Sequence, residues 1–125
     1  MDSFTFKAND GVSDSSKATV TITITPINDS PTANSQNNIV ANENIEKSII
    51  LTGSDLEGDN LSFVLVTAPT NGRLLDPGNG NKTIFKGTLS SDKVTYLSTS
   101  DKATSDSFVF KSYDGNSLSE NAAVS

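Results

Sequence analysis

The chain has 125 residues, and its 15 acidic and 9 basic side chains give a net charge of −6 at neutral pH. It contains no Cys and no His, which excludes disulfides and removes the thiolate nucleophile, the commonest zinc ligand and the usual general base. The acidic balance disfavours nucleic acid and anionic membranes as partners and favours cations, of which calcium prefers carboxylate and carbonyl oxygens. We therefore expect a non-enzymatic protein that does not bind nucleic acid.

Apolar residues are sparse and evenly spread. Hydrophobic residues make up 34% of the chain and aromatic residues 6%, and Ser, Thr, Asn, Asp and Gly fill the intervals between them. This composition is typical of an all-β protein with a thin core and many turns. No apolar run approaches the roughly 18 residues of a membrane span, so no membrane insertion is expected. Met1 leads directly into a strand-like segment rather than a leader, which suggests a piece of a longer protein.

The first element of the chain is repeated near its end. Residues 2–20 match residues 106–124 at 11 of 19 positions, beginning with DSFTFKANDG in the first copy and DSFVFKSYDG in the second. A period of about 100 residues suits a complete small domain rather than a solenoid unit. The chain is therefore interpreted as one period plus an overlap.

Residues 17–25, KATVTITIT, form the clearest predicted strand. Apolar residues alternate with Thr, so that Ala18, Val20, Ile22 and Ile24 share one face. Strict alternation of β-branched residues predicts a half-buried strand.

Further short strands follow in chain order, separated by turn-forming stretches such as SDLEGDN, TAPTNG and DPGNGNK. No segment has helical periodicity. Strands at this spacing predict an all-β, antiparallel Greek-key sandwich of about seven strands. The predicted strands are Ile39–Ala41, Lys47–Leu51, Leu61–Val66, Gly72–Leu75, Thr83–Lys86, Lys93–Leu97 and Asp106–Lys111.

The second copy of the repeat stops at Ser125, where the first copy continues through Ile22 and Ile24. The repeat unit is therefore expected to lack its last strand, which would leave an open sheet edge. We expect residues 17–25 to fill that edge, either within one molecule, as in a circular permutation, or between molecules, as a strand-swapped oligomer. The intervening residues 26–38 can span roughly 40 Å when extended, which permits both arrangements.

Several motifs together resemble a bacterial cadherin-like repeat. Residues 6–31, FKANDGVSDSSKATVTITITPINDSP, resemble the close of such a repeat, and residues 39–51, IVANENIEKSIIL, resemble its opening. SDLEGDNLSFVL is similar to its DxD/DxDGD calcium turn and APTNG to its P-x-x-G hairpin, while VTYL and DSFVF resemble later strands. The resemblance implies a cadherin- or Ig-like sandwich, with residues 1–25 ending a preceding repeat, 26–38 as the linker and 39–125 as one repeat.

The same resemblance implies calcium ions at the junctions between repeats. The implied ligands are the linker pair, the two acidic residues of the DLE turn, the Asp of YDG and, at the opposite pole, the Glu of NEN: Asn28, Asp29, Asp55, Glu57, Asp114 and Glu43. Asp59 is a further candidate ligand, because the three carboxylates of this turn lie within five residues and repel one another unless a cation neutralises them. The alternative is that these residues serve only as solvated β-turn residues. Pro26 stands where a full calcium linker begins with Asp, which argues against a complete set of junction ions.

The resemblance implies a structural or adhesive module of a large extracellular or surface protein, with neighbouring repeats as its partners. An alternative is a carbohydrate-binding or accessory domain of a secreted polysaccharide-degrading enzyme, which a flat platform of Tyr96, Tyr113 or Phe85 would favour. Homophilic contact through an open edge is a third possibility. Asp76, beside Pro77, is interpreted as a hairpin residue rather than a catalytic carboxylate.

Overall fold

The computed structural model describes all 125 residues and contains strands but no α-helix. No helix is therefore available that is long and apolar enough to cross a membrane. The strands are β1 (Asp2–Phe6), β2 (Ala18–Ile22), β3 (Thr32–Ala33), β4 (Lys47–Ile50), β5 (Gly53–Ser54), β6 (Ser62–Thr67), β7 (Gly72–Asp76), β8 (Lys82–Ile84), β9 (Gly87–Thr88), β10 (Lys93–Ser98), β11 (Phe108–Tyr113) and β12 (Ala122–Val124). One short 3-10 turn, η1 (Pro77–Asn79), follows β7.

Two four-stranded antiparallel sheets form the body of the molecule. One has the order β4-β10-β7-β8 and the other β12-β11-β6-β9. Strands adjacent in the sheets are mostly not adjacent in the chain, because the chain crosses between the sheets from β4 to β6 and again after β6, β8, β9 and β10. This arrangement confirms the predicted all-β sandwich with Greek-key crossovers.

The core lies between the two sheets, where alternate residues of each strand point inward. In β11, Phe108, Phe110 and Ser112 are buried, and the residues that alternate with them are only partly covered. The Phe110 ring lies 5.9 Å from the Phe63 ring and 6.5 Å from the Phe108 ring, measured between centroids. Eleven buried side chains form this single cluster: Ile49, Leu51, Phe63, Leu65, Leu74, Leu89, Val94, Phe108, Phe110, Ala122 and Val124.

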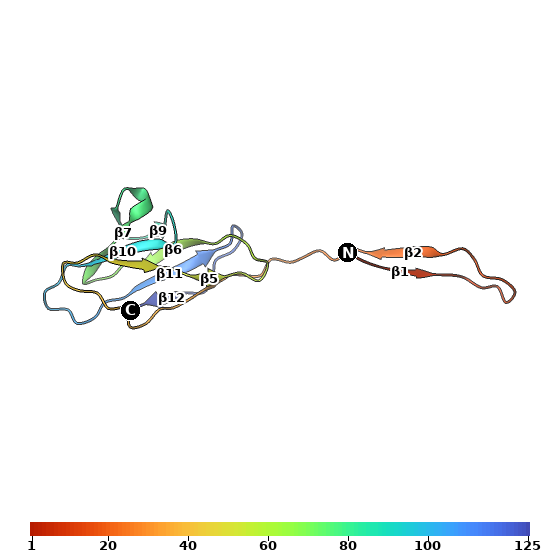
Figure 1. Cartoon of the computed structure of the whole chain (residues 1–125), viewed down its shortest axis with the longest axis horizontal. Helices are drawn as coiled ribbons and strands as arrows, with labels where there is room; N and C mark the ends of the chain where they lie inside the picture. The colour runs from red at the N-terminus through yellow and green to blue at the C-terminus, as the bar shows by residue number, and fades with distance from the viewer.

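Strands β1 and β2 form a separate hairpin that pairs with neither sheet. Figure 1 shows this hairpin standing away from the sandwich, joined to it by an extended segment. The prediction that residues 17–25 complete a sheet within the same molecule is therefore wrong. The physical reason is that β12 already pairs with the edge of β11 that the incoming strand would need. Docking between molecules is not tested by a single chain and stays a prediction.

The sandwich has a short last strand, contrary to the expectation that it lacks one. β12 pairs with β11 on one side. Its other side is covered by residues 36–39, which run parallel to it: Gln36 N donates to Ala123 O at 2.9 Å, and Ile39 N donates to Ser125 O at 3.0 Å. The second half of the predicted linker, from β3 onward, therefore packs on the sandwich, and the free extended segment is shorter than residues 26–38.

Most predicted strands form with small shifts of their ends. The exception is Ile39–Ala41, which is not a strand, and the preceding Asn38 has a φ of 63°, in the left-handed region. The sequence did not predict the short strands β3, β5 and β9. Each has only two residues, too few to carry an alternating pattern; β3 and β5 pair with each other, and β9 pairs with the middle of β6.

The repeated sequence folds into the same hairpin twice. In both copies the first Phe pairs with Val and the second with Ala, as Phe4↔Val20 and Phe6↔Ala18, and as Phe108↔Val124 and Phe110↔Ala122. The environments differ, because Phe4 and Phe6 are 54% and 50% exposed whereas their counterparts are 3% and 0% exposed. The N-terminal hairpin thus has the apolar face of β11 and β12, but no second sheet covers that face.

The turns of the two hairpins also share their hydrogen bonds. The Ser15 Oγ accepts from the backbone N of Ala8 at 2.9 Å, and the Ser119 Oγ accepts from the backbone N of Ser112 at the same distance. The Asp that precedes Gly in each turn accepts two backbone N–H bonds through its Oδ1. Local sequence therefore sets the register and the turn bonds of the hairpin in both copies.

Replacing Phe110 with Ala is expected to lower the free energy of unfolding of the sandwich by about 3 to 5 kcal/mol, because a fully buried ring leaves a cavity. The matched control is Phe6→Ala, at the equivalent position of the bare hairpin, which should change it by less than about 0.5 kcal/mol. Urea unfolding of both variants measures the difference. Equal losses would show that the N-terminal hairpin is buried against a core in solution.

Ser112 is fully buried, and its Oγ makes no hydrogen bond, whereas the first copy of the repeat has Ala8 at this position. Ser112→Ala should therefore leave the free energy of unfolding unchanged or raise it by up to about 1 kcal/mol. Ser119→Ala is the control, because its Oγ bonds Ser112 N and Glu120 O and its loss should cost about 1 to 3 kcal/mol. A large loss in Ser112→Ala would contradict the assignment of an unpaired hydroxyl.

Candidate functional site

The linker meets the sandwich at one pole, through the side chain of Asn28. Its Nδ2 donates to Asp114 Oδ2 and to Ser117 Oγ, both at 3.0 Å. Asn28 lies 86 positions before Asp114 in the chain, so these bonds tie the extended segment to the turn after β11. The structure thus brings together two predicted site residues, one from the linker and one from the YDG turn.

The carboxylate of Asp114 accepts several hydrogen bonds. Backbone N atoms of Asn116 and Ser117 donate to Oδ1, both at 2.6 Å, and Ser117 Oγ donates to Oδ2 at 3.0 Å. The Ser117 amide, and after it the Asn28 side chain, hold the pKa of Asp114 well below its ordinary value, because they favour the charged form. Asp114 is therefore a charged anchor for the linker. Sequence reasoning missed Ser117, since a Ser three residues after an Asp is common in turns.

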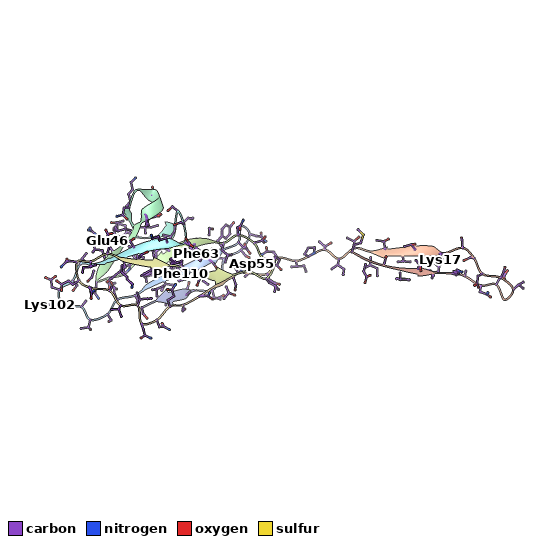
Figure 2. All side chains as sticks on the ribbon, in the orientation of Figure 1. Lys17, Glu46, Asp55, Phe63, Lys102 and Phe110 are labelled. Atoms are coloured by element: carbon purple, nitrogen blue, oxygen red, sulfur yellow. The ribbon has the colours of Figure 1, made fainter.

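The other linker residue, Asp29, contacts the acidic DLE turn through its backbone. Asp29 N donates to Glu57 Oε2 at 3.3 Å. Within the turn, Asp59 N donates to Asp55 Oδ1 at 3.0 Å, while Asp55 Oδ2 is buried and has no hydrogen-bond partner. Figure 2 shows Asp55 at the pole that faces the hairpin. The turn and the linker therefore meet at this pole, and one buried carboxylate oxygen there is unpaired.

A recess beside Asp55 is lined in part by three carboxylates, those of Asp55, Asp59 and Asp92. Asp92 comes from the turn before β10, and its carbonyl accepts from Leu51 N at 2.7 Å. Asp92 was not predicted from the sequence, because only the pairing of β10 with β4 brings it to this pole. The structure holds no group of three or more acidic side chains arranged to hold a metal ion. The predicted ligands are neighbours, but they do not form a coordination shell as placed.

Glu43 lies apart from the other predicted ligands. It forms a bridge with Ser98, the last residue of β10, and its Oε1 accepts from Asn44 Nδ2 at 3.1 Å. Figure 2 shows Glu46, three residues later, towards the pole away from the linker. Glu43 therefore lies away from the linker pole, and its role as a ligand stays a prediction.

Other candidate groups have structural roles. Asp76 is buried, and its carboxylate accepts from the backbone N and the hydroxyl of Ser90, which joins β7 to the turn before β10.

The three candidate platform aromatics lie on different strands and loops. Phe85 is 73% exposed, whereas Tyr96 and Tyr113 are half-buried. The Tyr96 hydroxyl donates to Asp106 Oδ2 at 2.8 Å, and burial together with this carboxylate raises the pKa of Tyr96 to about 12.

Comparison with known proteins gives one partial match to report. A stretch of 67 residues is 48% identical to "Integrin beta-like protein A" of Dictyostelium discoideum. The match covers 50% of this chain and 4% of that protein, so the chain spans a small fraction of its relative. No family model matches the chain, and no solved structure matches it. Membership of the bacterial cadherin-like family therefore stays a prediction.

Replacing Asn28 with Ala should raise the pKa of Asp114 towards the ordinary value, because one hydrogen bond to its charged form is lost. Asp10, in the equivalent turn of the bare hairpin, is an internal control. Its pKa is lowered by the amides of Ser13 and Val12, which the substitution does not touch. Titration of the carboxyl carbon shifts by NMR measures both groups, and an unchanged Asp114 would contradict the contact.

The sign of the pH dependence follows from the same shift. A lowered folded pKa means that the contribution of Asp114 to stability is fully present above its unfolded pKa of about 3.9. The contribution is lost as the pH falls below that value towards the folded pKa. Asn28→Ala should therefore lower the free energy of unfolding near pH 7 and leave it little changed at acid pH, where Asp114 is protonated, so that stability falls less as the pH drops.

Proposed function

We propose that the chain is a non-enzymatic structural module of an extracellular or surface adhesion protein built from tandem repeats. The hairpin then belongs to a preceding unit and the sandwich to the next one. The observation that carries this proposal is the bare hairpin, which has the register and the apolar face of β11–β12 but no opposing sheet. A preceding sandwich supplies such a sheet.

The partial likeness to a protein named as integrin beta-like supports an adhesion-type context. The matched stretch is a small part of that protein. The net charge of −6 and the absence of Cys agree with a solvent-exposed repeat that needs no disulfides. The partners are then the neighbouring repeats of the same protein. The proposed mechanical role is that of a rod segment, with the extended residues between β2 and β3 as the joint.

Calcium at the linker pole is the finer part of the proposal. Asp55, Glu57, Asp59 and the linker residue Asp29 would hold the ion, and neutralisation of their charges would fix the joint. The unpaired, buried Oδ2 of Asp55 supports this assignment, because a buried carboxylate oxygen without a donor costs free energy. Glu57 and Asp29 are exposed, so their side chains have room to rotate towards Asp55. We expect weak binding, in the range of about 10⁻⁴ to 10⁻³ M that is usual for extracellular modules.

Carbohydrate binding has less support. A flat platform needs several exposed aromatic rings side by side, and of the three candidates only Phe85 is largely exposed.

Strand swapping between molecules through the bare hairpin also remains a proposal. A molecular mass that doubles as the protein concentration rises, measured by size exclusion, would support it.

Calcium at about 10 mM should raise the melting temperature by about 4 to 8 °C if the dissociation constant is near 1 mM, because only the folded state binds the ion. Asp55→Asn should abolish this rise. Asp101→Asn is the matched control, since it removes one negative charge from the loop beside Lys102, at the opposite pole (Figure 2). A flat response to calcium, or an equal loss in both variants, would leave the acidic turn as an ordinary solvated turn.

A further inference from the structure

In four places an Asp or Asn is followed directly by Gly: Asp10-Gly11, Asn71-Gly72, Asn79-Gly80 and Asp114-Gly115. Gly has no Cβ, so its backbone nitrogen can approach the side chain that precedes it. In three of the pairs hydrogen bonds hold that side chain. Oδ1 of Asp10 and of Asp114 each accepts two backbone N–H bonds, and Asn71 Nδ2 donates to Ser105 O at 3.0 Å. The side chain of Asn79 differs, because it is exposed and makes no hydrogen bond.

The backbone around Asn79 is also open. Asn79 ends η1, the short 3-10 turn between β7 and β8, which Figure 1 draws as a green coil that projects away from both sheets. Residues 78–82 are all exposed, and a side-chain carbon placed on Gly80 would meet no neighbouring atom. Hydrogen bonds of a single 3-10 turn have poor geometry and open at little cost. The peptide that joins Asn79 to Gly80 therefore has room to rotate.

The same dipeptide at the start of β7 is fixed. Asn71 N donates to Asp106 Oδ2 at 3.0 Å, and the Asn71 carbonyl accepts from Thr99 N at 3.0 Å. Gly72 pairs with β10, and a side-chain carbon placed on it would overlap the Tyr96 ring. Rotation of this peptide requires local opening of the ladder between β7 and β10, which costs free energy.

We propose that Asn79 is a site of spontaneous deamidation and that the fold protects Asn71 from the same reaction. The backbone N of Gly80 attacks Cγ of Asn79, so that an N–Cγ bond forms and the Cγ–Nδ2 bond breaks. The amide proton of Gly80 leaves with the released amino group as ammonia, and a cyclic imide remains. Water then opens the imide at either carbonyl and gives Asp or a β-linked isoaspartate. The net reaction consumes water, releases ammonia and transfers no electrons.

Both products change the β7–β8 turn. They add a negative charge to a turn whose first residues carry none, and the isoaspartate also adds a methylene group to the backbone. The turn is closed by the bond from Asn81 N to Asp76 O at 3.0 Å, and β8 is an edge strand that pairs only with β7. Because η1 has no buried residue, the effect should stay at this edge and leave the core unchanged. The proposal does not depend on adhesion or on calcium.

The test incubates the full chain in mildly alkaline buffer and follows deamidation by mass spectrometry after trypsin digestion. Cleavage after Arg73 and Lys82 places Asn71 and Asn79 on separate peptides. In the folded protein Asn79 should react at least about tenfold faster than Asn71, because the reaction at Asn71 must await local opening. In concentrated urea the two rates should converge, since both residues then precede Gly in an unfolded chain. Equal rates in the folded protein, or the same difference in urea, would overturn the proposal.

Two variants test the cause of the difference. Asp106→Ala removes the acceptor of the Thr70 and Asn71 amides, so the rate at Asn71 should rise several-fold while the rate at Asn79 stays the same. An unchanged rate at Asn71 would contradict protection by these contacts. Asn79→Gln should remove most of the reaction from its peptide, because the longer side chain forms the cyclic imide far more slowly. A product at Asn79 that contains Asp but no isoaspartate would mean direct hydrolysis by water and would overturn the imide route.

Discussion

One constraint governs this molecule: a β-hairpin with one apolar face is stable only when another sheet covers that face. The chain contains the same hairpin twice, in the same register and with the same turn bonds. The second copy is covered by the sheet of β4, β10, β7 and β8, and its phenylalanines form the centre of the core. The first copy lies alone, and its two phenylalanine rings are about half exposed.

The same constraint gives the linker pole its importance. If repeats follow one another, the joint between them must be positioned without a large interface, because the segment between β2 and β3 is extended. The structure positions it with a few polar contacts: Asn28 on the charged Asp114, and Asp29 N on Glu57. Contacts of this kind are directional but weak, so a bound cation is a physically reasonable way to strengthen them.

Patterns in the sequence predicted the larger part of the fold. Alternation located β4, β6, β10 and β11, which have a buried face, and also β2, whose apolar face is uncovered here. The sequence failed where pairing depends on distant segments. The two-residue strands β3 and β5 have no pattern of their own, and the coverage of β12 by residues 36–39 arises only when both sheets form. The expectation of cis docking failed because a three-residue strand already occupies the edge.

The candidate site was predicted in part, for the same reason. Motifs placed Asn28 and Asp114, or Asp29 and Glu57, at one pole, and the structure brings each pair into contact. Ser117 and Asp92 were missed because a Ser in a turn and an Asp before a strand have no distinctive spacing. A site residue could thus be predicted only when it lies in a recognisable turn motif, whatever contacts it makes at the linker pole.

The central claim is that burial between the sheets, and not the hairpin's own hydrogen bonds, stabilises the repeated unit. Native-state hydrogen exchange tests it most directly, because the two hairpins share their pairing but not their burial. The amides of β11 and β12 should exchange only through global unfolding, while those of β1 and β2 exchange many times faster. Equal protection of the two hairpins in a monomeric sample would contradict the claim.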